Sequence, residues 1–171
     1  MTVTTARDVV EVLESLTAAD VPWWVAGGWA VDALVGEQTR PHDDVDVMVP
    51  LAAAPTVEAS LGRLGFARAD ESELPAFLIL RDPRGRQVDL YLVQVDAAGD
   101  AWQEHSATKW DRFSAAELSG TGRIEEITVR CLSPEALFRQ FLGYTWGEKA
   151  IHDLTALHRV FGAPLPPGFA A

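Results

Sequence analysis

The chain has 171 residues, a formal net charge of −11, and a hydrophobic content of 48%. This length and apolar content suit one folded domain with a substantial core, and they argue against a disordered protein. The acidic charge argues against broad contact with a nucleic-acid backbone, which requires a basic surface. The single cysteine, Cys131, excludes an internal disulfide and a cysteine-rich zinc site.

No apolar run approaches the ~20 residues that span a bilayer, so we expect no contact with a membrane. The residues before Arg7 lack a basic segment followed by an apolar one, so they do not resemble a secretory signal. We therefore expect a cytoplasmic protein. Its acidity would attract metal ions and cationic small molecules, although the same charge serves solubility equally well.

The first predicted element is an amphipathic helix over residues 5–19, which Thr4 or Thr5 caps. Its inward face holds Val9, Val12, Leu13 and Leu16. This helix indicates packing and carries no chemistry.

A glycine pair follows, between a short strand and a second helix. The apolar run of residues 23–26 is typical of a buried strand, and residues 29–35 have apolar side chains at helical spacing. Gly27 and Gly28 therefore lie where the helix begins, and Gly36 ends it. Free backbone N–H groups at a helix start bind phosphate, and a missing Cβ allows close approach. A plain tight turn is the alternative interpretation.

The next strand, residues 44–49, begins with an Asp-x-Asp motif. Because strand side chains alternate, Asp44 and Asp46 project from one face while Val45, Val47 and Val49 enter the core. Two adjacent carboxylates repel one another unless a cation lies between them, and Mg²⁺ prefers such oxygen ligands. The alternative is a solvated edge strand.

The remaining chain predicts a helix over 54–64, a hairpin of strands 77–80 and 87–93, and a second hairpin of strands 118–124 and 127–131. Residues 96–114 lack a clear period, and we interpret them as a loop or short helix near the mouth of the site. The alternative is a surface connection whose tryptophans pack into the core. Two helices close the chain, at about 133–142 and 148–161. In the last helix we expect Ile151, Leu154, Leu157 and Phe161 to face inward, with Lys149, His152 and Asp153 on another, polar face.

The glycine pair followed by Asp-x-Asp resembles the signature of the nucleotidyltransferase superfamily, which has a polymerase-β-like fold. More narrowly, residues 27–34 and 39–46 resemble the small antibiotic nucleotidyltransferases, namely the aminoglycoside 2″-adenylyltransferases and the lincosamide nucleotidyltransferases. The resemblance implies an α+β fold with a small mixed sheet and a short C-terminal helical region. It implies a core over residues 1–132, a helical region over 133–162 and a tail over 163–171.

The resemblance also implies roles for further residues. On pattern alone, Asp89 would be an outward-facing strand residue. Superfamily members carry a third carboxylate on a neighbouring strand, however, and the motif around Asp89 is similar. Neighbouring strands lie about 4.8 Å apart, so this carboxylate could share a metal cluster with the other two. Lys149 matches a lysine that contacts the nucleotide phosphates. Arg40 and His42 are secondary candidates for nucleotide contact; alternatively, Arg40 braces the loop and His42 caps it.

The activity that the resemblance implies is the transfer of a nucleoside monophosphate to a hydroxyl of a small aminoglycoside- or lincosamide-like antibiotic. The donor is ATP or another nucleoside triphosphate, and two Mg²⁺ ions assist. One alternative is a minimal nucleotidyltransferase that modifies a protein, as in toxin–antitoxin pairs. Others are a nucleotide-binding regulator without turnover and a calcium-binding structural module. The oligomeric state stays open.

Overall fold

The structure is a computed structural model that describes residues 3–142, 147–162 and 165. It is an α+β domain, as expected. The helices are α1 (Ala6–Ala18), α2 (Gly27–Val35), α3 (Ala54–Gly62), α4 (Pro134–Leu142) and α5 (Glu148–Phe161), with a 3₁₀ turn η1 (Leu51–Ala53). The strands are β1 (Trp24–Val25), β2 (Val45–Pro50), β3 (Ala67–Arg68), β4 (Phe77–Arg81), β5 (Gln87–Val95), β6 (Ala101–Ser106), β7 (Lys109–Phe113), β8 (Gly120–Ile124) and β9 (Ile127–Cys131).

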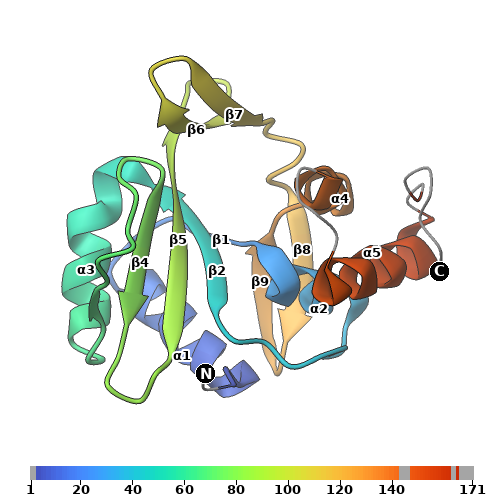
Figure 1. Cartoon of the computed structure of the whole chain (residues 1–171), viewed down its shortest axis with the longest axis horizontal. Coiled ribbons are helices and arrows are strands. Elements are labelled where there is room, and N and C mark those ends of the chain that lie inside the picture. The colour runs from blue at the N-terminus through green and yellow to red at the C-terminus, as the bar shows by residue number, and fades with distance from the viewer. Residues whose placement is uncertain (1–2, 143–146, 163–164, 166–171) are drawn as a thin grey trace.

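The strands form one mixed sheet in the order β3-β4-β5-β2-β1-β9-β8. β2 pairs in parallel with β5 and antiparallel with β1, and β1 pairs in parallel with β9. The core lies where the alternating apolar residues of β2 and β5 meet the apolar faces of the helices. Figure 1 shows α1 and α3 together on one side of the view and α2, α4 and α5 together on the other. α1 packs against α3, and α2 contacts both α4 and α5.

The first helix begins where its capping residues predict. Thr5 accepts a hydrogen bond from the backbone N–H of Asp8, and the Asp8 carboxylate accepts one from the backbone N–H of Thr5. This reciprocal pair satisfies two backbone donors that the helix leaves open. The predicted inward face is confirmed, because Val9, Val12, Leu13 and Leu16 are buried.

The prediction of a loop or short helix over residues 96–114 is wrong. The segment forms the β6–β7 hairpin, which pairs with the end of β5 and projects at the top of Figure 1. Ala101 and Gln103 are buried in it. The buried glutamine hides the alternation that marks a strand, and its amide N–H donates to the carbonyl of Ala76 at 3.0 Å.

The expected orientation of the last helix is wrong in part. Leu154 and Leu157 are buried, but Ile151 is 37% and Phe161 43% exposed. Asp153, expected on a polar face, is completely buried instead. An ion pair with Arg40 accounts for this, because it turns the helix so that a charged residue faces the core. The tail predicted after residue 162 lies outside the described residues except for residue 165, and the proposed division at residue 132 stays a prediction.

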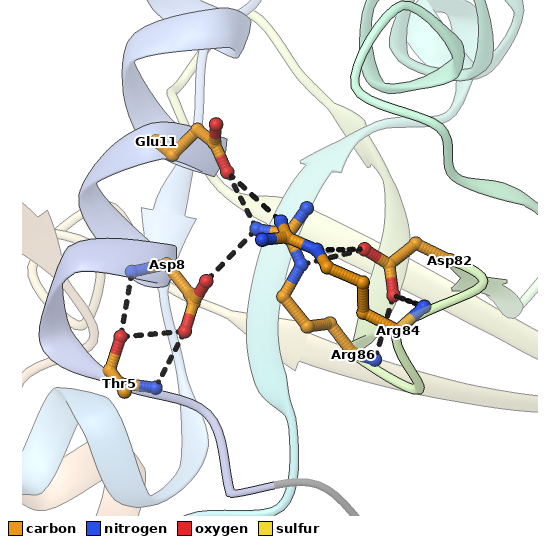
Figure 2. A network of polar contacts seen from close by, with 6 residues as sticks. All are labelled: Thr5, Asp8, Glu11, Asp82, Arg84 and Arg86. Atoms are coloured by element: carbon orange, nitrogen blue, oxygen red, sulfur yellow. Dashed lines mark hydrogen bonds and ion pairs between the residues drawn. The ribbon is translucent and has the colours of Figure 1, made fainter.

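A buried arginine ties the first helix to the β4–β5 turn. The guanidinium of Arg86 donates to Asp82 at 2.7 Å, to Asp8 at 3.0 Å and to Glu11 at 2.5 Å, as Figure 2 shows. Arg84, in the same turn, also binds Asp82, but its side chain is 64% exposed. Within the described residues, none of the helices has the length and apolar character that a bilayer crossing requires.

We expect Arg86→Ala to lower the free energy of unfolding by about 3 kcal/mol, because it leaves the buried carboxylate of Asp82 without its principal partner. Arg84→Ala is the matched control and should cost less than about 1 kcal/mol, since the Arg84 side chain is largely exposed to water and Asp82 keeps its bonds to Arg86. Urea unfolding of both variants measures the difference. Equal losses in the two variants would show that burial of Arg86 adds nothing.

Candidate active site

Two aspartates meet on adjacent strands. β2 and β5 run parallel in a register that pairs Val45 with Val88 and Asp46 with Asp89. Because side chains alternate along a strand, paired positions project from the same face, so both carboxylates leave the sheet together. Asp44 lies just before β2, near enough that its charge raises the pKa of both Asp46 and Asp89.

These carboxylates lie in an environment that opposes their ionisation. Burial raises the pKa of Asp46 well above its ordinary value, and the charges of Asp44 and Asp89 raise it further. The Tyr91 hydroxyl donates a hydrogen bond that acts in the opposite direction. Burial also raises the pKa of Asp89, against a hydrogen bond of 2.8 Å from Gln87. The site therefore concentrates negative charge that a bound cation would relieve.

The glycine pair lets the carboxylate approach the start of α2. Gly27 has a φ of +57°, and a Cβ built there would lie 1.9 Å from Oδ2 of Asp46. A Cβ on Gly28 would lie 2.4 Å from Nη2 of Arg40 and 2.6 Å from the His42 ring. Neither position has room for a side chain. The pair is therefore required for this packing, and its binding of phosphate stays a prediction.

Two polar contacts hold the loop that carries Asp44. Nε2 of His42 lies 2.5 Å from Oδ2 of Asp32, while the other carboxylate oxygen of Asp32 accepts hydrogen bonds from Thr39. The guanidinium of Arg40 binds Asp153 of α5 through two bonds, of 2.8 and 2.6 Å. His42 is 2% exposed and stacks on Trp29. These contacts support the bracing interpretation of Arg40 and place His42 beneath the surface.

Lys149 lies in the first turn of α5 and reaches back to the same loop, where it forms an ion pair with Asp43. It faces a cavity of about 220 Å³. The cavity is lined by Gly27, Gly28, Arg40, Asp46, Tyr91, Gln140, Phe141, Lys149, Ala150 and Asp153. Five of the eight predicted site residues thus line this cavity. Asp44, Asp89 and His42 do not line it. The charges of Asp44 and Asp89 nevertheless act on Asp46, which does.

A second cavity, of about 340 Å³, shares Tyr91 and Gln140 with the first. It opens toward the β6–β7 hairpin and is lined by His105 and Lys109, which belong to the segment predicted to lie near the mouth of the site.

The sequence did not single out Tyr91, Gln140 or Asp153. Tyr91 could have been found, because it lies two residues after Asp89 on β5 and so projects from the same face. Gln140 and Asp153 gave no such signal. Their place depends on how α4 and α5 pack against α2.

The case for a metal ion at this site rests on the negative charge gathered there, because the side chains that the structure describes do not form a complete set of ligands. Among the described residues, no three His, Cys, Asp or Glu side chains converge as a ready-made metal site. Asp44 and Asp89 are nevertheless close enough to Asp46 to raise its pKa. Carboxylate oxygens at one sheet edge are also the donors that Mg²⁺ selects. The residues present fit a magnesium site.

The sequence matches the family described as aminoglycoside-2″-adenylyltransferase over residues 8–157. The chain belongs to this family. It is therefore a nucleotidyltransferase, which confirms the resemblance. A 2″-aminoglycoside nucleotidyltransferase of Escherichia coli is 30% identical over 132 residues, covering 75% of this chain and 70% of that protein. A lincosamide resistance protein of Staphylococcus haemolyticus is 23% identical over 156 residues, covering 91% and 96%.

Solved structures share the fold. A lincosamide antibiotic adenylyltransferase with lincomycin bound has a TM-score of 0.83 at 22% identity, covering 93% of this chain and 99% of the other. ANT(2″)-Ia in complex with adenylyl-2″-tobramycin has a TM-score of 0.69 at 23% identity, covering 92% and 90%. The nucleotidyltransferase fold expected from the sequence is confirmed.

We expect Asp46→Asn to stabilise the metal-free protein at pH 7. The pKa of Asp46 is higher in the folded state than its ordinary value of 3.8, so folding binds protons between those two pKa values. The carboxylate therefore removes stability as pH rises through that window, and the loss persists above it. Asparagine does not titrate and avoids the loss.

Urea unfolding in EDTA at pH 4 and pH 7 measures this effect. The advantage of the variant over the wild-type protein should be larger at pH 7. Asp70→Asn, which removes an exposed carboxylate, is the control and should change stability by less than about 0.5 kcal/mol. An Asp46→Asn variant that is less stable than the wild-type protein at both pH values would contradict the prediction.

Proposed function

We propose that this protein transfers AMP from ATP to a hydroxyl group of a small antibiotic and releases pyrophosphate. The observation that carries the proposal is the pairing of Asp46 with Asp89 beside the start of α2, in a member of a nucleotidyltransferase family. Relatives named for aminoglycosides and for lincosamides support an antibiotic as the acceptor.

The first cavity is the proposed place of the triphosphate. The positive end of the α2 dipole and its open N–H groups would face the phosphates at Gly27 and Gly28. Lys149 lies on the same cavity and would exchange its contact with Asp43 for a phosphate oxygen. Arg40 keeps its bonds to Asp153 and holds the loop in place.

Asp44, Asp46 and Asp89 would hold Mg²⁺. Three carboxylates carry enough negative charge to bind two such ions. When bound, the metal would supply positive charge that stabilises the attacking and leaving oxygens. The Tyr91 hydroxyl and the Gln87 amide orient the carboxylates of Asp46 and Asp89 through their hydrogen bonds. This support from neighbouring groups fixes the direction of each ligand.

The proposed reaction is an in-line displacement at the α-phosphorus. The acceptor oxygen forms a bond to the α-phosphorus, the bond from the α-phosphorus to the bridging oxygen breaks, and pyrophosphate leaves with that oxygen. Asp89 takes the proton of the acceptor hydroxyl. In the metal-free protein burial raises the pKa of Asp89, and a carboxylate of raised pKa is a stronger base than an ordinary aspartate.

The second cavity is the proposed place of the acceptor. It shares Tyr91 with the first cavity, so a hydroxyl bound there can approach a nucleotide bound beside it. The direct test is pyrophosphate release from ATP with Mg²⁺ across a panel of hydroxylated antibiotics. Release that no antibiotic in the panel accelerates would reject the proposal.

We expect ATP to stabilise the fold only when Mg²⁺ is present. At ~100 times its dissociation constant, ATP should add about 2.7 kcal/mol to the free energy of unfolding. Thermal unfolding with ATP in Mg²⁺ and with ATP in EDTA measures the effect. The same stabilisation in EDTA would remove the metal role from Asp44 and Asp46.

We expect Asp89→Asn to lower turnover by roughly 10²–10⁴, because asparagine cannot accept the proton of the acceptor hydroxyl. Nucleotide binding with Mg²⁺ should largely persist, since asparagine keeps one carbonyl oxygen. Asp46→Asn is the companion variant and should lose nucleotide binding as well as turnover. Titration of ATP with Mg²⁺ beside the rate assay separates the two. If both variants lose binding equally, Asp89 acts first as a metal ligand.

A further inference from the structure

The two lysines of the chain occupy the two adjoining cavities. Lys149 lines the first cavity and Lys109 lines the second. Lys109 begins β7 at the tip of the hairpin, where its side chain is exposed. Among the described residues it has no ion-pair partner. In an acidic chain, an unpaired lysine at this position adds positive charge to the lining of the second cavity.

The other charged groups of the second cavity are already paired. Arg139 of α4 also lines it, and its guanidinium binds Glu117 at 2.7 Å and lies over the ring of Phe113. One carboxylate lines the cavity in the described part of the chain, that of Asp111, and it already contacts Nε2 of His105 at 2.9 Å. A ligand with several ammonium groups would find few acceptors here.

The uncharged part of the lining is aromatic and amide-bearing. The Phe77 ring packs edge-on against Tyr91, with the ring centres 5.2 Å apart, and is tilted against the His105 ring, with the centres 5.6 Å apart. The three rings therefore form a continuous wall. Gln103 and Gln140 add side-chain amides. Such a wall suits the apolar face of a sugar or an alkyl group, while the amides suit its hydroxyls.

We propose that the acceptor is a hydroxylated molecule of low positive charge with an apolar portion, and that Lys109 discriminates against polycationic aminoglycosides. The inference rests on the proposed function, because it takes the second cavity as the acceptor site. It sets the chain apart from the aminoglycoside activity that describes its family.

The distance over which charges act decides whether the cavity or the whole molecule governs the binding of a cation. The net charge of −11 attracts any cation at a distance. At physiological salt, however, charges separated by more than about 8 Å are largely screened. The groups that line the cavity therefore dominate once the ligand is bound. An ammonium beside Lys109 is repelled, and each ammonium without an acceptor loses hydration.

Calorimetric titration tests the proposal with the full chain, Mg²⁺ and α,β-methylene ATP, which cannot release pyrophosphate. Lincomycin, with one basic nitrogen, should bind more tightly than tobramycin, with several amino groups, at about 0.15 M salt. Lys109→Glu should improve the binding of tobramycin relative to lincomycin roughly tenfold, because it reverses one charge at the cavity. Arg63→Glu, an equal reversal on an exposed residue after α3, is the matched control and should leave the ratio unchanged.

Tobramycin binding as tight as that of lincomycin would overturn the proposal, as would a ratio that Lys109→Glu leaves unchanged or a failure of lincomycin to bind. Pyrophosphate release from ATP separates this inference from the proposed function. If lincomycin binds as expected but ATP yields no pyrophosphate with it, the proposed function fails while the selectivity of the cavity stands.

Discussion

The parallel, in-register pairing of β2 with β5 is the constraint on which the site depends. It sets Asp46 directly beside Asp89, and the start of α2 presses against the same carboxylate. Hydrophobic packing of the valines and leucines on the other face holds this register, since a slip by one residue would turn those side chains outward. The core therefore maintains a concentration of like charge that is unfavourable in itself. Protons or a cation must relieve it.

Buried polar contacts place the groups around these carboxylates. Arg40 bonds to Asp153 and so joins the loop before β2 to α5, the helix that carries Lys149. His42 bonds to Asp32 and joins the same loop to α2. Both pairs are far less exposed than the contact of Lys149 with Asp43. The protein thus separates charges that fix its shape from a charge that is free to exchange partners, which a site that must admit and release a nucleotide requires.

The sequence predicted the parts of this arrangement that depend on local chemistry. Glycine at a helix start, alternating valines around Asp46, and a capping threonine each act within a few residues, and each was found in place. The misses involve contacts between distant segments. Asp153 is buried because of Arg40, which lies more than a hundred residues away, and no period within α5 reveals that partner. The β6–β7 hairpin was missed because a buried glutamine interrupts its apolar pattern.

The same distinction bears on what the net charge can say about a substrate. Overall acidity pointed toward cationic ligands, yet the acidic groups near the site gather where the strands present Asp46 and Asp89. A few residues away, across Tyr91, the lining becomes basic and aromatic. Bound metal would neutralise the carboxylates of Asp46 and Asp89. The charge that an acceptor meets is then that of the second cavity. The net charge of the whole chain therefore affects the rate at which a ligand associates, while the side chains around a cavity determine which ligand stays bound.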